Sequence, residues 1–323
     1  PRHNIEGMWE SVDTTNDSWA YAWYDEHWKS PKEILKRLIA CVGRGGTYML
    51  NIGPRGDGTV PGRAVETLEQ SGEWIQRYPQ VVYGTQASPW LHALPWGDVT
   101  RKGNTLFLCV FDWPSSGTLY LPNLKTGIVS AELLGRETSA AITTGRRGDW
   151  VSLKLPTRAP EKLISVIELK LDGEPEVDPI WSLDPNIKTE LLAEFAEVTG
   201  IEKSEKRWME KFGEWKGIVH AHGFQSGGSA TWEIEVLEPG DYNVDLTYAG
   251  QGRLVWRVAI EGGEQIQNQQ NSSHNYQSFP IGWLSFPNAS RYKVSVTCID
   301  GDIEFQSHAD GSSGSLSGCM DFA

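Results

Sequence analysis

The sequence predicts a mixed fold, with β/α architecture at the start of the chain followed by two antiparallel β-sandwiches. Before residue 85, helical apolar periodicity alternates with a short, almost wholly apolar segment. From about residue 88, short segments of period-two alternation appear, each bounded by Gly, Pro or Asn. A length of 323 residues is enough for two or three domains.

Residues 1–85 carry the β/α pattern. Ser30 reads as the N-cap of a helix, with Pro31 at the first helical position and Glu33 at the third, and the helix ends at Gly43. The segment TYMLNIG is typical of a parallel strand covered on both faces. After a structural turn, a second helix is predicted to bury one face made of Val65, Leu68, Gly72 and Ile75. Two such units are too few to close a barrel of eight strands.

Residues 86–172 are predicted to form a small β-sandwich, through segments such as NTLFLCVFDW and LISVIELKL. Residues 173–216 are predicted to be a linker with a helix, because the acidic segment DGEPEVDP leads into the helical pattern KTELLAEFAEVTG. Residues 217–323 are predicted to form a second β-sandwich, through segments such as SATWEIEVLEPGDYNVDLTYA and RLVWRVAIEGG. Alternation along its strands predicts that Trp232 and Trp256 lie in its core.

Composition limits the classes of partner. The formal net charge is −13 and no block of Lys or Arg stands out, which argues against nucleic acid and against an anionic membrane surface. No apolar run approaches the roughly 20 residues of a membrane helix, so we expect no membrane partner. The cysteines show neither zinc spacing nor a redox motif, so no metal site and no cofactor is predicted. They read as buried free thiols, with a Cys298–Cys319 bridge as the alternative.

An ordered series of motifs in residues 9–85 resembles the end of the catalytic barrel of α-L-fucosidases, glycoside hydrolase family 29. The series runs WE, NDSWAY, KSPKEILKRLIACVGRGGTYMLNIGPRGDGTVP and GEWIQRYPQVVYGT. Departures are small: Ala20 stands where the family has Gly, and Tyr48 and Met49 replace plain aliphatics. The resemblance implies the C-terminal part of a (β/α)8-type barrel. The sandwich of residues 86–172 resembles, more loosely, the one that follows the barrel in this family. The sandwich of residues 217–323 resembles, in general pattern only, the carbohydrate-binding-type sandwiches appended to some members.

The resemblance implies a retaining glycosidase that removes terminal α-L-fucose from glycans or glycoconjugates. Such an enzyme uses a carboxylate nucleophile and a second carboxyl about 5 Å away. The family's nucleophile is an Asp on an earlier barrel strand, which we expect upstream of Pro1. The chain alone is therefore expected to be inactive and to need the rest of the catalytic barrel as its partner. The family also suggests a secreted, periplasmic or lysosomal location, and an oligomer is possible.

Three residues near the start are candidates for the site. The resemblance makes Glu10 the candidate general acid, since it matches the Glu proposed for that role in some members, whereas in others the acid lies further upstream. Glu10 is expected at the carboxyl end of a barrel strand, where Met8 and Trp9 would raise its pKa. The alternative for Glu10 is a structural carboxylate that accepts a loop amide. Trp19 resembles the aromatic wall of the fucose pocket, and Trp9 is placed with it at the substrate; the alternative for Trp19 is the core. Trp23 and Trp28 are assigned to packing.

The last sandwich has two readings. Trp283 and Tyr276 lie next to predicted loops and are the candidates for a platform on which glycans stack. The alternative to the enzyme as a whole is therefore a non-catalytic portion that binds glycan or serves as a structural accessory.

Overall fold

The computed structural model describes residues 4–135, 140–209, 215–224, 227–250, 252–271, 273, 276–300 and 319–322. The described residues are mostly β-strand with few helices, and the chain divides into one unit at Pro1–Pro179 and another at Ile180–Ala323. None of the helices in these residues is both long and apolar enough to cross a lipid bilayer.

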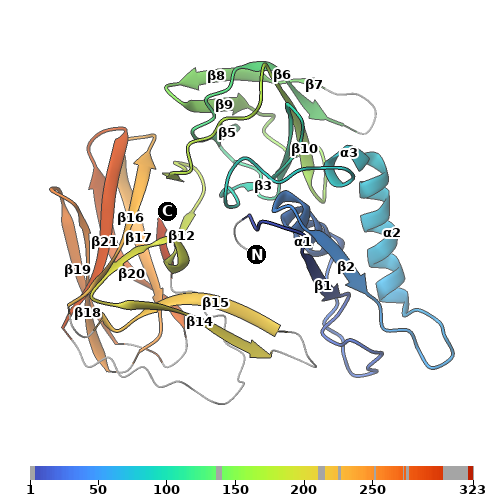
Figure 1. Cartoon of the computed structure of the whole chain (residues 1–323), viewed down its shortest axis with the longest axis horizontal. Helices are drawn as coiled ribbons and strands as arrows, with labels where there is room; N and C mark the ends of the chain where they lie inside the picture. The colour runs from blue at the N-terminus through green and yellow to red at the C-terminus, as the bar shows by residue number, and fades with distance from the viewer. Residues whose placement is uncertain are drawn as a thin grey trace. The chain divides into compact units, whose positions relative to one another are not determined.

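The first unit opens with a β–α–β arrangement. Strand β1 (Glu10–Thr14) leads through a long loop to α1 (Pro31–Gly43) and then to β2 (Thr47–Asn51), and the two strands pair in parallel (Figure 1). The predicted capping box at the start of α1 is confirmed: Ser30 Oγ accepts from the Glu33 amide, and the Glu33 carboxylate accepts from the Ser30 amide. These local bonds start the helix at the expected residue.

Helix α2 (Gly62–Arg77) forms as predicted but buries another face. Ala64, Thr67, Ser71 and Trp74 are buried, whereas the predicted Val65 and Leu68 are each 37% exposed. The reason is tertiary: the Trp74 ring is buried and its Nε1 donates to the Ile164 carbonyl 2.8 Å away. This buried hydrogen bond orients α2 with the face of Trp74 toward the core. The short helix α3 (Pro79–Val82) follows.

An antiparallel sandwich completes the first unit, as predicted. One sheet has the order β3–β4–β10–β6–β7 and the other β5–β9–β8. The three helices contribute to the core that lies on β4 and β10. The strands are β3 (Gly97–Lys102), β4 (Thr105–Val110), β5 (Thr118–Leu121), β6 (Ile128–Leu134), β7 (Ala140–Ala141), β8 (Thr143–Arg147), β9 (Trp150–Lys154) and β10 (Ser165–Leu171).

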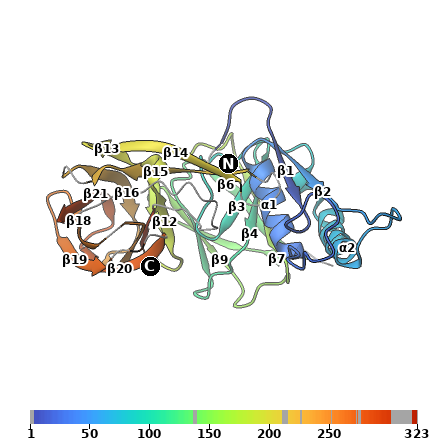
Figure 2. The ribbon, with the colours of Figure 1, turned by 90° about the horizontal axis from the view of Figure 1, so that it is seen from below.

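The second unit is a sandwich with an added hairpin, drawn in yellow to red in Figure 2. One sheet has the order β11–β16–β21–β18–β19, with β13 also on β16, and the other β12–β22–β17–β20. Strands β14 and β15 pair with each other. The elements are β11 (Trp181–Leu183), β12 (Thr189–Leu192), η1 (Ala193–Phe195), β13 (Glu197–Thr199), β14 (Glu202–Met209), β15 (Trp215–His222), β16 (Ser229–Val236), β17 (Gly240–Tyr248), β18 (Arg253–Ile260), β19 (Gln265–Asn271), β20 (Gln277–Phe286), β21 (Ser290–Asp300) and β22 (Cys319–Phe322).

The helix predicted within residues 173–216 is wrong. Its segment forms β12, one 3-10 turn and β13 instead. Helix-forming Leu, Ala and Glu are overridden there because both strands find partners far along the chain, β22 for β12 and β16 for β13.

The predicted core of the second unit is confirmed. Trp232 and Trp256 are 4% and 3% exposed. Cys41, Cys109 and Cys298 are buried free thiols. The side chain of Cys319, named in the alternative disulfide, lies outside the described residues.

Candidate functional site

The carboxyl ends of β1 and β2 lie together and hold the loop that carries Trp19. Thr14 and Asn51 are paired as the last residues of the two strands. Asn51 Nδ2 donates to the Trp19 carbonyl 2.7 Å away, which ties the loop to the end of β2. Gly53 lies against the loop so closely that a Cβ there would sit 2.8 Å from the backbone of Ala20. Carboxyl ends of parallel strands are where β/α proteins place ligands.

A buried charge cluster under this edge fixes β1 to α1. The Asp13 side chain is 5% exposed, pairs with Lys29 Nζ at 3.2 Å and Arg37 Nη1 at 3.3 Å, and accepts from the Tyr48 hydroxyl at 2.8 Å. Burial alone would raise the pKa of Asp13, but Arg37, the Thr14 amide, Tyr48 and Lys29 together lower it below its ordinary value. Asp13 is therefore a carboxylate at neutral pH.

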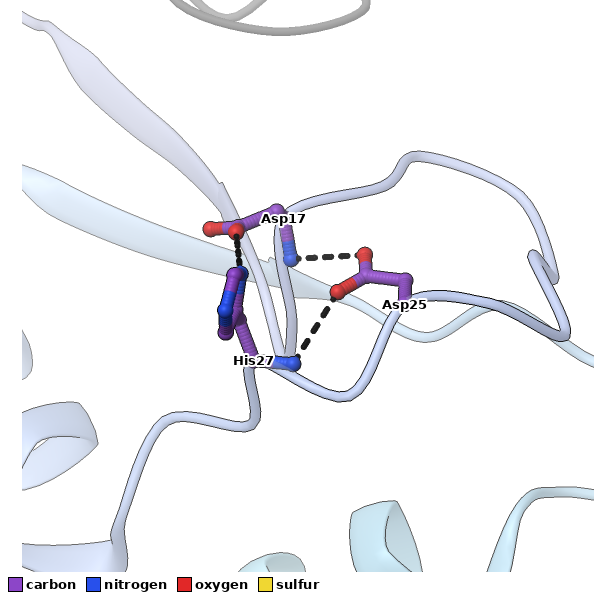
Figure 3. A group of neighbouring side chains, drawn as sticks. All are labelled: Asp17, Asp25 and His27. Carbon is purple, nitrogen blue, oxygen red and sulfur yellow. Dashed lines mark hydrogen bonds and ion pairs between the residues drawn. The ribbon is translucent and has the colours of Figure 1, made fainter. Parts of the chain in front are cut away.

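The loop itself is fastened around Asp25 (Figure 3). Asp25 Oδ2 accepts from the Asp17 amide at 3.1 Å and the Ser18 hydroxyl at 2.7 Å, while Oδ1 accepts from the His27 amide at 3.2 Å. His27 Nδ1 lies 2.9 Å from Asp17 Oδ2. These bonds preorganise the loop around Trp19, a role that sequence reasoning missed because the loop has no regular spacing.

Asp17, Asp25 and His27 also have the residue types of a metal site, with ligand atoms within 4.8 Å of one another. Both oxygens of Asp25 and one oxygen of Asp17 are already engaged within the loop. The contacts account for the cluster as the internal support of a loop, so we assign no metal to it.

Glu10 does not stand where it was expected. It is the first residue of β1, at the amino end, four residues or roughly 13 Å of strand away from Thr14. Its side chain is exposed, with the Thr47 hydroxyl 3.5 Å from Oε1, and Met8 is fully exposed. The expected position at the carboxyl end is wrong because pairing with residues 47–51 starts the strand at Glu10 itself.

Trp9 lies at the same amino end and packs on the chain after α1. Its Nε1 donates to the Arg44 carbonyl at 3.4 Å, and a Cβ on Gly46 would meet the Trp9 ring at 2.3 Å. Trp9 and Trp19 are thus at opposite ends of the strand pair, and the structure does not bring them together.

Of the two tryptophans assigned to packing, Trp28 is half-buried and Trp23 is exposed. Trp19 is half-buried, but Trp23 is 78% and Tyr24 59% exposed, and their rings meet edge to face at 5.7 Å. Arg55, from the loop after β2, lies over the Tyr21 ring at 5.5 Å. The assignment of Trp23 to packing is wrong, because polar bonds around Asp25 rather than an apolar core shape this loop.

In the second sandwich the two platform candidates have different surroundings. Trp283 is 63% exposed on β20. Tyr276 is half-buried and lines an apolar cavity of about 50 Å³ together with Trp232, Tyr248 and Trp256. Tyr276 is thus partly held in the apolar interior of this sandwich, whereas Trp283 is open to solvent on its strand.

Comparisons with known proteins agree with the motif series. Residues 1–80 match the family model described as alpha-L-fucosidase. An alpha-L-fucosidase of Dictyostelium discoideum is 28% identical over 166 residues, which cover 47% of this chain and 35% of that protein. A plasma alpha-L-fucosidase of Rattus norvegicus is 31% identical over 163 residues, which cover 48% and 34%. The chain spans about a third of the length of these curated relatives.

A solved structure is similar over nearly the whole chain. The alpha-L-fucosidase from Vibrio sp. strain EJY3 superposes with a TM-score of 0.70 at 22% identity, covering 99% of this chain and 55% of that one. This likeness concerns the fold. The match of the first 80 residues and the curated relatives support an assignment to the α-L-fucosidase family, glycoside hydrolase family 29.

Proposed function

We propose that the chain is the C-terminal portion of a retaining α-L-fucosidase that removes terminal fucose from glycans. The observation that carries this proposal is the family match over residues 1–80, the same segment that ties an aromatic loop to the carboxyl ends of two parallel strands. In this proposal residues 1–85 complete a (β/α)8-type barrel, and residues 86–172 and 217–323 are accessory sandwiches.

The open face of the β1–β2 pair supports a barrel completed by further strands. In the described residues these strands pair only with each other. On the face opposite the Asp13 cluster, Val12 and Met49 lie side by side and are 40% and 46% exposed. In a closed barrel this face points inward and these side chains are buried.

The proposed chemistry is a double displacement. A carboxylate attacks the anomeric carbon, the glycosidic oxygen takes a proton from the general acid, and water then hydrolyses the glycosyl-enzyme while the same acid acts as base. We place the nucleophilic Asp on a part of the barrel outside this sequence, in keeping with the third of the relatives' length that the chain covers.

Within this chain, we propose that Trp19 packs on the apolar face of the fucose ring. The amino-end position of Glu10 favours its alternative role as a structural carboxylate over proton donation. The packing of Trp9 on Gly46 likewise favours a supporting role over direct contact with substrate.

The test is product stereochemistry with the complete protein. Fucose released from an aryl α-L-fucoside and followed by proton NMR is expected first as the α-anomer. Initial release of the β-anomer would overturn the retaining mechanism, and no release at all would overturn the fucosidase proposal. Glu10→Gln separates the two roles of Glu10: a proton donor loses most activity on natural glycans but little on aryl substrates with good leaving groups.

A second candidate function, glycan attachment through the last sandwich, rests on the exposed Trp283. A glycan array probed with the chain and with Trp283→Ala tests it. Equal binding by both proteins would exclude Trp283 from such a platform.

A further inference from the structure

Two histidines stand side by side on the β14–β15 hairpin, which extends from the second sandwich in Figure 1. His220 and His222 alternate along β15, and Ala221 between them packs against the core. Because alternate residues of a strand share a face, both imidazoles point to the face away from that core. Their ring centres are 5.1 Å apart.

That spacing suits a shared metal ion. A tetrahedral Zn²⁺ bound by one nitrogen of each ring at about 2.0 to 2.1 Å holds the two ring centres roughly 5 Å apart. We propose that His220 and His222 form a binding site for a borderline divalent transition metal such as Zn²⁺.

The hydrogen bonds of His220 leave one nitrogen available. Its Nδ1 is shielded from solvent and has no hydrogen-bond partner among the described residues, while the ring bonds to the backbone of Ser204, the residue directly opposite on β14. We therefore assign the Ser204 contact to Nε2–H, donating to the carbonyl. A metal-binding histidine characteristically donates its other N–H to such a carbonyl, which orients the ring and fixes the tautomer.

The protonation state favours the same role. Burial, with His222 and Lys206 nearby, lowers the pKa of His220, which favours the neutral imidazole over the charged one. A neutral imidazole is the form that binds metal. Lys206 acts against a bound cation, so the site is expected to be of moderate rather than structural-zinc affinity.

Glu202 is the third ligand in reach. It is exposed and directly opposite His222, on the same face of the hairpin. Cross-strand pairs place their Cβ atoms about 5 Å apart, a distance that a rotated Glu side chain spans. Two imidazoles, one carboxylate and a water would complete a tetrahedral site. The site belongs to the second unit alone and does not depend on the proposed fucosidase activity.

The test is a Zn²⁺ titration of the chain by calorimetry at pH 7.5, with circular dichroism to confirm that each variant is folded. We expect one ion per chain, bound at least about tenfold more weakly by His220→Gln and by His222→Gln, and more weakly by Glu202→Gln. His27→Gln is the matched control: it removes the histidine of the Asp17–Asp25 group and should leave Zn²⁺ binding unchanged.

Binding by His220→Gln and His222→Gln equal to that of the unaltered chain, or loss of binding only in His27→Gln, would overturn the proposal. So would the absence of binding up to about 1 mM Zn²⁺. A measurement without mutation guards against misfolded variants: in imidazole NMR spectra of the unaltered chain, Zn²⁺ should perturb two histidine rings together. Perturbation of only one ring would contradict a shared site.

Discussion

At the scale of residues, two contacts hold the backbone at Trp19 and Ala20 in place. Asn51 binds the Trp19 carbonyl, and Gly53 receives the backbone of the next residues. Both contacts survive any side-chain substitution at position 19. A change of the ring can therefore be read as a change at the proposed sugar face.

In the proposed complete fucosidase, Trp19→Ala should weaken fucose binding by about 1 to 3 kcal/mol, because the substitution removes a large apolar surface from the ligand. Trp19→Phe should retain much of that affinity. Melting temperature and L-fucose affinity are measured together for both variants. A large loss of stability with unchanged affinity would instead place Trp19 in the core.

Trp9→Ala is the matched control. Because Trp9 packs on Gly46 at the other end of β1, its removal should lower the free energy of unfolding by about 3 kcal/mol and leave fucose affinity unchanged. A lower fucose affinity in folded Trp9→Ala would instead show that Trp9 contacts the substrate.

Asp13 makes stability depend on acid. Because its pKa is lower in the folded than in the unfolded state, its stabilising contribution is complete above the ordinary value of 3.8 and is lost as the pH falls through the lower folded value. Asp13→Asn should cost about 3 kcal/mol at pH 7, since it leaves Lys29 and Arg37 without their shared partner.

The measurement is urea unfolding between pH 2 and 7. Asp13→Asn should flatten the acid limb of the stability curve. Asp57→Asn is the comparison: the amide and hydroxyl of Thr59, two residues away, lower the pKa of Asp57 through contacts within one exposed turn, so this variant should flatten the acid limb less than Asp13→Asn. An unchanged acid limb in Asp13→Asn would show that Asp13 has the same pKa in both states.

At the scale of elements, the glycines after α1 allow the helix–strand connection to close on Trp9. Gly46→Ala should cost about 1 to 3 kcal/mol, because its new methyl would lie 2.3 Å from the Trp9 ring. Gly56→Ala, in the loop after β2 with open space around it, should change stability little. Thermal unfolding compares the two; equal effects would mean that the Trp9 ring moves aside freely.

The same scale shows what the sequence can predict. Helix α1 was predictable because its start depends on bonds between neighbours, Ser30 and Glu33. The buried face of α2 was not, because Trp74 finds its partner at Ile164, 90 residues away. The helix predicted in residues 189–199 was wrong for the same reason, since the strands that form there depend on pairing with distant strands.

The candidate site also has features that local sequence predicts and features that depend on distant contacts. Motifs predicted the segment that carries Trp19, because the family series is local; the contact of Trp19 with sugar stays a prediction. The position of Glu10 depends on where strand pairing begins, and the exposure of Trp23 depends on what covers its loop. Neighbouring residues in the sequence determine neither of these features.

At the scale of the whole molecule, the proposed position of the nucleophilic Asp outside this sequence predicts that the chain alone is inactive. The 323 residues alone should release no fucose from an aryl α-L-fucoside, because binding groups without the nucleophile lose most of the rate. The complete protein should turn over under the same conditions. Comparable turnover by the chain would refute the placement of the nucleophile outside this sequence.

The unpaired edge of β2 allows a structural test of the proposal that further barrel strands lie outside this sequence. Strand β2 pairs only with β1 in the described residues, so the amides on its other side lack a strand partner. In the isolated chain the amides of Thr47–Asn51 that do not bind β1 should exchange with solvent rapidly, whereas in the complete protein a neighbouring barrel strand should slow them by orders of magnitude. Amides of β10, paired on both sides by β4 and β6, serve as the control and should exchange alike in both proteins. Equal exchange of the β2 amides in the two proteins would mean that no strand covers this edge, and the barrel proposal would fail while the family assignment stood.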